Sequence, residues 1–151
     1  MPTITGSSSI DIDAPLQRCW AAVAAVESGP EWQDGLESAV VKHRDEHGHA
    51  TLVETTNDAK VRKVRSIVAF TYDEPQRLTW RQIEGDLKSV EGSWTLEDLG
   101  DGRTRATYNL ALDPGRILGM AIRGPLVDVL RRQLVDGRAN ELARRLDNTS
   151  S

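Results

Sequence analysis

The chain lacks the features that mark several large classes of protein. Its single cysteine, Cys19, excludes an internal disulfide. No apolar run approaches the ~20 residues of a membrane span or the apolar segment of a signal peptide. There is also no glycine-rich phosphate-binding loop and no internal repeat. These absences predict a cytoplasmic protein without stable membrane insertion.

The chain also lacks a large excess of positive or negative charge. The net charge is −4 and the isoelectric point is near 5.4. Because phosphate binding requires a strongly basic face, no nucleic acid partner is expected. Three short basic groups are interpreted as solvated faces: the arginine pairs at 131–132 and 144–145 on the outer side of a helix, and a run opposite Asp58, Glu84 and Glu91 that comprises Lys60, Arg62, Lys63 and Arg65.

Residues with metal-binding or nucleophilic chemistry do not combine into a site. His43, His47 and His49 surround one predicted turn, with no nearby cysteine and no second group of ligands. Cys19 has no histidine near it in sequence, and its place on an apolar helix face predicts burial. We therefore expect no metal site, no catalytic cysteine and no cofactor.

The most informative segment is 77–112, which predicts three consecutive antiparallel strands. Alternation places one set of apolar residues on a single face: Leu78, Trp80, Val90, Trp94, Leu96, Tyr108, Leu110 and Leu112. A three-residue turn at 85–87 sets Leu78 opposite Trp94 and Trp80 opposite Gly92. A second three-residue turn at 100–102 sets Trp94 opposite Tyr108. Gly92 would leave space for the Trp80 indole.

The segment before residue 77 predicts further elements. A strand at 4–12 leads to a helix capped by Asp13, with Leu16, Trp20 and Val23 inward together with Cys19. This helix ends near 28–30, and a helical turn follows at 31–33. Strands are expected at 36–44, 50–57 and 61–73. In the last strand the more apolar even positions should face inward: Val64, Ser66, Val68, Phe70 and Tyr72.

The segment 116–146 is amphipathic at helical spacing. Its apolar positions are Leu118, Ile122, Leu126, Val129, Leu130, Leu134, Leu142 and Leu146. Gly124 and Pro125 interrupt this pattern and predict a short helix followed by a longer one. Laid across the apolar face of the sheet, these helices can enclose a pocket. At 151 residues the chain suits one domain, 1–151, that is large enough for both a core and a cavity.

Several segments in this order resemble one superfamily. They are IDIDAP at 10–15, CW at 19–20, PEW at 30–32, EGDLKSVEGSWTLE at 84–97 and DGRTRATYNL at 101–110, followed by the closing helix. The sequence is similar to the START-like, birch-pollen-allergen-like (SRPBCC) superfamily, in its bacterial polyketide cyclase/dehydrase-like branch. The resemblance implies an α+β helix-grip fold. In it, a curved seven-stranded antiparallel sheet wraps around a long C-terminal helix, with two short helices between the first and second strands.

The resemblance also implies a deep cavity for a hydrophobic small molecule. Relatives bind lipids, steroids, quinones, plant hormones or polyketides, and some cyclise reactive chains. The residues expected to contact such a ligand are Trp32, Ser66, Val68, Phe70, Tyr72, Trp80, Gln82, Trp94, Tyr108, Leu118, Ile122 and Leu126. Val64, Leu78 and Val90 are further candidates for the cavity wall. An aromatic wall serves a core as well as a pocket, so each of these residues has a purely structural alternative.

Two functions remain open on this basis. Binding of a lipid, quinone or polyketide-like molecule by a monomer or weak homodimer is favoured. The alternative is a polyketide cyclase or aromatase that folds its substrate by shape, with Ser66, Tyr72 and Tyr108 as the candidate acid-base groups. The pattern gives no clear inward arginine, and only Arg62 and Arg123 are ambiguous. This shortage favours binding over catalysis.

Overall fold

The computed structural model describes residues 4–60, 62–122 and 124–149. The strands are β1 (Ile4–Ile12), β2 (Leu36–Arg44), β3 (Ala50–Asp58), β4 (Lys63–Asp73), β5 (Arg77–Gly85), β6 (Ser89–Gly100) and β7 (Arg103–Asp113). The helices are α1 (Leu16–Ala24), the 3-10 helix η1 (Val26–Glu31), α2 (Gly115–Ala121), α3 (Pro125–Arg131), the π-helix η2 (Arg132–Asp136) and α4 (Arg138–Thr149). None of these described helices is long and apolar enough to cross a membrane.

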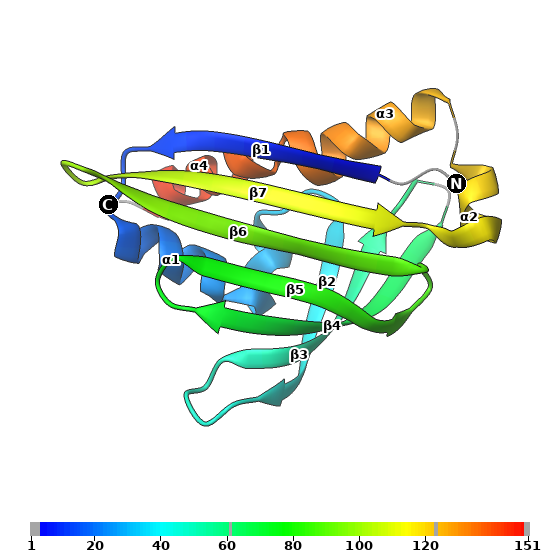
Figure 1. The fold of residues 1–151 in the computed structure, drawn as a ribbon, viewed down its shortest axis with the longest axis horizontal. Coiled ribbons are helices and arrows are strands. Elements are labelled where there is room, and N and C mark those ends of the chain that lie inside the picture. Colours follow the sequence, from blue (N-terminus) through cyan, green and yellow to red (C-terminus); the bar gives the residue numbers. More distant parts are fainter. Residues whose placement is uncertain (1–3, 61, 123, 150–151) are drawn as a thin grey trace.

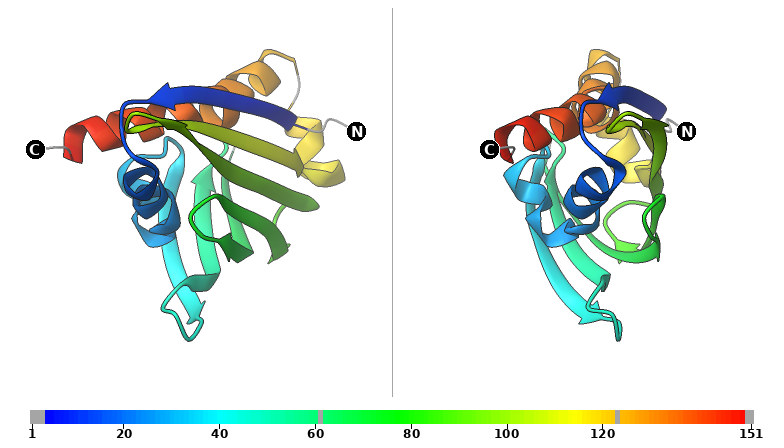
Figure 2. Two further views of the ribbon diagram at one scale, coloured as in Figure 1. Left: turned by 60° about the vertical axis from the view of Figure 1, so that its left-hand side comes forward. Right: turned by 90° about the vertical axis from the view of Figure 1, so that its left-hand side faces the viewer.

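The seven strands form one antiparallel sheet in the order β1-β7-β6-β5-β4-β3-β2. The two edge strands are therefore β1 and β2, which precede and follow α1 and η1 in the sequence. The sheet is strongly curved, and the helices lie on its inner side (Figure 2). The segment α3–η2–α4 runs along β1, and Arg138 of α4 reaches the Asp34 backbone just before β2, so the C-terminal helices connect the two edges of the sheet. This arrangement is the helix-grip fold.

The predicted registers of the central hairpins are confirmed. Leu78 pairs with Trp94, Trp80 with Gly92, and Trp94 with Tyr108. The second turn differs from the prediction. It contains only Asp101 and Gly102, both at positive φ, and a bulge between Asp98 and Gly100 supplies the extra residue. A two-residue turn plus a bulge thus produces the same register as the three-residue turn that was expected.

The shared apolar face of β5, β6 and β7 is the main wall of the core. Of the eight residues placed there by alternation, Trp80 and Val90 are half-buried and the other six are buried. In β4, Val64, Ser66 and Val68 are buried, whereas Phe70 and Tyr72 are half-buried. The alternation of side chains along a strand therefore predicted the inner face of these strands correctly.

The segment between β1 and β2 departs from the prediction at two places. Asp13 does not cap α1, since the helix begins after Pro15 and no described side chain caps it. The Asp13 carboxylate instead accepts a hydrogen bond of 3.1 Å from Arg103 Nε, so the ion pair across the hairpin takes the carboxylate away from the helix. The brief helical segment expected at 31–33 lies earlier, as η1, and Trp32 follows it.

The C-terminal segment divides where glycine and proline predicted. Gly124 has a φ of 61° and Pro125 is the first residue of α3. The longer helix that follows is not uniform, because the π-helix η2 and Gly137 separate α3 from α4. A π-turn contains one more residue than an α-turn, and it shifts the inward face of the residues that follow.

The basic run near β4 is neutralised, though mostly by other acids than expected. Lys63 pairs with Glu37 at 2.9 Å, Arg62 with Asp86 at 3.6 Å, and Arg65 with Glu54. The expected partners Asp58, Glu84 and Glu91 form none of these ion pairs. The strand register decides this, because β3 presents Glu54 beside β4, while β2 presents Glu37 on the far side of β3.

Candidate ligand-binding cavity

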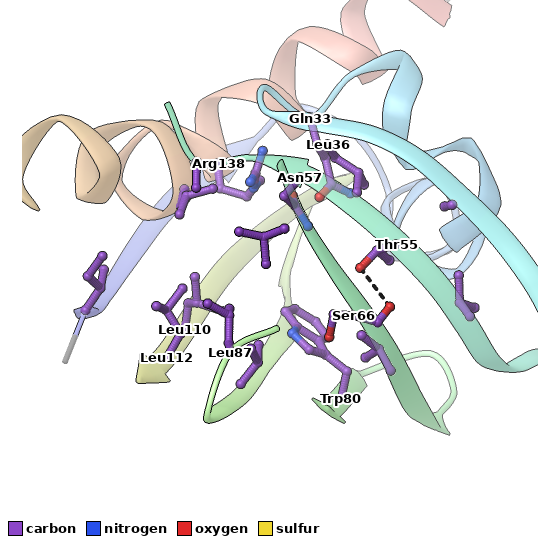
Figure 3. A pocket seen from close by; sticks show the side chains of 18 of the residues that line it. Gln33, Leu36, Thr55, Asn57, Ser66, Trp80, Leu87, Leu110, Leu112 and Arg138 are labelled. Atoms are coloured by element: carbon purple, nitrogen blue, oxygen red, sulfur yellow. Dashed lines mark hydrogen bonds between the residues drawn. The ribbon is translucent and has the colours of Figure 1, made fainter. Parts of the chain in front are cut away.

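A cavity of about 160 Å³ lies between the inner face of the sheet and the C-terminal helices. Its wall is mostly apolar and includes residues from all seven strands and from α1, η1, α2, α3, η2 and α4. Trp80 and Leu87 lie near one end of it, and Arg138, Asn57 and Gln33 lie near the other (Figure 3). The interior is therefore mostly apolar, with Thr55 and Ser66 on its wall and a group of polar side chains at one end.

Most of the residues predicted to contact a ligand line this cavity. They are Ser66, Val68, Phe70, Trp80, Trp94, Tyr108, Leu118 and Ile122, together with Val64, Leu78 and Val90. They come from β4, β5, β6, β7 and α2, or from the residue directly after α2. Residues far apart in sequence thus surround one space.

Aromatic rings form a continuous wall on one side. Phe70 lies 6.0 Å from Trp80, Trp80 lies 5.6 Å from Tyr108, and Tyr108 lies 4.8 Å from Trp94, measured between ring centroids. All three pairs are tilted, an arrangement that aromatic quadrupoles favour over face-to-face stacking. Such a wall offers a flat apolar surface to a ligand that has rings or unsaturated chains.

Tyr72 does not line the cavity, in contrast to the prediction. Its hydroxyl donates a hydrogen bond of 2.6 Å to the Ala50 carbonyl, and its ring stacks on His49 at 4.3 Å. Trp20 of α1 meets the same ring edge-on at 6.3 Å. Alternation assigns Tyr72 to the inner face but says nothing about which part of an 11-residue strand the cavity reaches. Here α1 covers the end of β4.

Trp32 and Leu126 also lie outside the cavity lining. The Trp32 ring packs against Trp94 at 6.2 Å, which places it behind the aromatic wall. Its indole Nε1 is buried and has no hydrogen-bond partner among the described residues. Leu126 is half-buried in the first turn of α3, and Leu130, one turn later, lines the cavity in its place.

Gln82 supports the wall without lining it. Ser66 Oγ donates a hydrogen bond of 2.8 Å to Gln82 Oε1, and Gln82 Nε2 donates one of 2.8 Å to the Leu87 carbonyl. Both polar side chains are therefore satisfied by the protein itself. Ser66 lines the cavity with its hydroxyl oxygen still able to accept a hydrogen bond.

Arg138 is an inward arginine that the sequence interpretation missed. Its side chain is 3% exposed and lines the cavity. Nη1 donates to Glu141 Oε1 at 2.8 Å and to the Asp34 carbonyl at 3.1 Å, and the guanidinium lies 5.7 Å from the centre of the Tyr108 ring. A signal was present, because 138 continues the spacing of four residues that joins Leu134, Leu142 and Leu146.

The two arginines considered earlier do not fill this role. Arg62 is exposed and pairs with Asp86. Arg123 lies outside the described residues. The inference that the interior lacks an arginine is therefore wrong, and the reason is that charged residues were assigned to the outer face of the helix by default.

Burial raises the pKa of both tyrosines. For Tyr108, desolvation raises the pKa, and the nearby Arg138 cation opposes this effect in part. For Tyr72, desolvation is again the main cause, and Glu27 and Asp45 add to it. Both phenols are thus protonated at neutral pH and can donate hydrogen bonds. Neither can act as a base there.

The His49 and Cys19 side chains serve packing, whereas His43 and His47 are exposed. His49 stacks on Tyr72, and its Nε2 lies 3.5 Å from Glu74 Oε1. Burial raises the pKa of the Cys19 thiol, which keeps the sulfur protonated. In the described part of the chain, no group of three or more His, Cys, Asp or Glu side chains could hold a metal ion.

A curved sheet that grips C-terminal helices around an apolar cavity defines a class of small-molecule-binding folds. The sequence of residues 12–137 matches the family described as polyketide cyclase / dehydrase and lipid transport. The chain belongs to this family, within the START-like superfamily. No curated protein sequence matches the chain.

Solved structures share the fold over nearly the whole chain. A START superfamily protein from Mycobacterium smegmatis is 17% identical with a TM-score of 0.82, covering 97% of this chain and 99% of its own. A protein from Thermus thermophilus is 24% identical with a TM-score of 0.80, covering 99% and 100%. The Zhui aromatase/cyclase from a Streptomyces species is 12% identical with a TM-score of 0.79, covering 97% and 95%. At these identities the likeness establishes the fold alone.

Proposed function

We propose that the protein binds a hydrophobic or amphipathic small molecule in the cavity between the sheet and the C-terminal helices. The observation that carries this proposal is the apolar cavity of about 160 Å³ with its continuous aromatic wall. A well-packed core has few voids larger than a water molecule, so an interior space of this size indicates a binding site rather than ordinary packing. The family description, which includes lipid transport, agrees with such a role.

The size of the cavity limits what it holds without rearrangement. A cavity of about 150 Å³ in another protein accommodates one benzene molecule, whereas sites for drug-sized ligands have roughly 300–1,000 Å³. A one-ring molecule therefore fits the space directly. A long lipid, a quinone with a tail or a polyketide requires the cavity to enlarge or the ligand to extend through its opening.

A cyclase or aromatase remains the second candidate, and one observation favours it. Arg138 supplies the inward cation that the sequence interpretation missed, and Tyr108 beside it can donate a proton or polarise a carbonyl. Proton abstraction also requires a base, which neither tyrosine can provide at neutral pH, and the Asp58 carboxylate on the cavity wall already accepts the Lys60 backbone N–H. Binding therefore ranks ahead of turnover.

The test combines native mass spectrometry of the purified protein with titrations of fatty acids, quinones and aromatic polyketides. A copurifying small molecule, or saturable binding of one class, supports the proposal. Val68→Phe, which fills the cavity, should abolish this binding. Val40→Phe is the matched control, since Val40 is exposed on β2 and lies outside the cavity lining. Absence of binding for every class, with both variants indistinguishable from wild type, would contradict the proposal.

A further inference from the structure

Building on the binding function above, we propose that the cavity selects a neutral molecule with an acceptor oxygen, such as a ketone, aldehyde or quinone carbonyl, over the corresponding carboxylate. Arg138 Nε is the group that would bind this oxygen. Glu141 is the group that would exclude the carboxylate.

Three polar contacts hold the Arg138–Glu141 pair in place. Arg138 Nη1 donates to Glu141 Oε1 and to the Asp34 carbonyl. Glu141 Oε2 accepts the Asp34 backbone N–H at 2.8 Å. Both oxygens of the carboxylate and one nitrogen of the guanidinium are thus bound to the protein. A donor held in this way loses little conformational freedom when a ligand binds.

The Nε–H donor of the Arg138 guanidinium is buried and has no hydrogen-bond partner among the described residues. A buried donor without a partner is costly, so such groups in native proteins usually bind a ligand or an ordered water. Arg138 is one of the residues at the polar end of the cavity, and a ligand oxygen reaches its Nε once the side chains that cover this atom move aside.

The charge around Arg138 decides which oxygen is accepted. Glu141 already neutralises the guanidinium at 2.8 Å, in a site where both side chains are less than a tenth exposed. Another acidic residue, Asp58, lines the cavity itself. A ligand carboxylate would therefore add an uncompensated negative charge to a poorly hydrated space, whereas a carbonyl adds none.

A purely structural role explains only part of this arrangement. The contacts of Nη1 and of Glu141 hold the backbone of Asp34 against α4. That function does not use Nε, and it does not require the side chain to line the cavity. Ligand selectivity therefore separates a binding role for Arg138 from a structural one.

Three one-ring compounds of similar shape test the proposal: acetophenone, benzoate and ethylbenzene. Isothermal titration calorimetry gives their affinities for the wild-type protein. Acetophenone should bind about tenfold more tightly than ethylbenzene, because a hydrogen bond to a charged group is gained, and at least about tenfold more tightly than benzoate. In side-chain 1H–15N spectra, acetophenone should shift the Arg138 Nε–H resonance, assigned from its absence in Arg138→Lys, and ethylbenzene should not.

Two variants sharpen the test. Glu141→Gln removes the compensating charge, and benzoate should then gain at least about tenfold relative to acetophenone. Arg138→Met combined with Glu141→Leu removes both charges together. It should keep ethylbenzene binding and lose the preference for the ketone. Circular dichroism checks that each variant is folded, and the wild-type ranking and the Nε–H shift test the proposal without either variant.

The outcomes separate this inference from the binding function. Equal affinities for the three compounds, or tightest binding of benzoate, would overturn the selectivity while leaving the cavity a binding site. An unchanged Nε–H resonance in the acetophenone complex, as expected if a water satisfies Nε, would also overturn it. If none of the three compounds binds, the selectivity proposal is overturned, and the separate titrations of fatty acids, quinones and aromatic polyketides decide the binding function.

Discussion

The indole of Trp80 lies directly over Gly92 on the neighbouring strand. A Cβ added at Gly92 would come within 2.5 Å of the indole ring. The glycine is therefore a packing requirement of the aromatic wall, because any larger residue must displace the ring that lines the cavity.

Gly92→Ala should accordingly cost about 1–3 kcal/mol of the free energy of unfolding, the usual penalty for overpacking. It should also weaken ligand binding, since Trp80 has to move. Urea denaturation and ligand titration measure the two effects. Thr95→Ala, on the opposite face of the same strand, is the control and should change neither. Normal stability of Gly92→Ala would show that the indole can shift freely.

Trp94→Phe should leave the fold intact and weaken ligand binding. Trp94 is buried between Leu78 on β5 and Tyr108 on β7, and its indole lines the cavity. Replacement by alanine would cost about 3–5 kcal/mol and would confuse binding with unfolding. The ligand-induced change in tryptophan fluorescence should fall in Trp94→Phe and persist in Trp20→Phe. Undiminished binding and fluorescence change would assign Trp94 to the core alone.

The two tyrosines should respond differently to replacement by phenylalanine. Tyr108 lines the cavity, so loss of its hydroxyl should reduce affinity for a contacting ligand by up to about tenfold. Tyr72 binds the Ala50 carbonyl away from the cavity, and Tyr72→Phe should cost about 1 kcal/mol of stability with affinity unchanged. Calorimetric titration and urea denaturation of both variants make the comparison. An affinity loss confined to Tyr72→Phe would reverse these assignments.

Stability should fall at high pH. Burial raises the pKa of both Tyr72 and Tyr108 above the ordinary value of 10.0. The unfolded chain releases these protons near pH 10 while the folded protein still holds them, so the stabilisation is complete below pH 10 and decreases above it. Urea denaturation between pH 8 and about 11 measures this decrease. A double Tyr→Phe variant should show a flatter profile, and an identical slope would contradict the assignment.

Access to the cavity should involve α2 and the break that follows it. Ile117 and Met120 of α2 are 86% and 62% exposed, and Gly124 and Pro125 interrupt the helical hydrogen bonding next to it. We expect amides in 116–122 and 124–126 to exchange faster than those of α4, and to slow when a ligand is bound. Hydrogen exchange followed by mass spectrometry tests this. Uniformly slow exchange, unaffected by ligand, would exclude a gate at this position.

Much of the fold could be predicted because local patterns determine it. Alternation assigned the inner face of the strands, the positions of the turns predicted the registers of Trp80 and Trp94, and Gly124-Pro125 marked the break between helices. The same patterns could not place a residue along its element. Tyr72 has the right parity, yet α1 covers it, and Leu126 lies one turn too early to reach the cavity.

Arg138 illustrates a different limit. Its spacing from Leu134 and Leu142 predicts an inward position, but its charge argues for an outward one, and the sequence alone does not show which effect prevails. Burial becomes favourable only with Glu141 one turn later and with the Asp34 backbone, which no local pattern brings to α4. Tertiary contacts of this kind have to be seen in the structure.

The double attachment of Asp34 also has a mechanical consequence. Its backbone N–H and C=O are both held by side chains of α4, so this single residue ties the start of β2 to the last helix. The same Arg138 side chain lines the cavity. A ligand that displaces Arg138 would therefore also displace Asp34, which is exposed, so that binding in the interior would change the surface of the molecule at this residue.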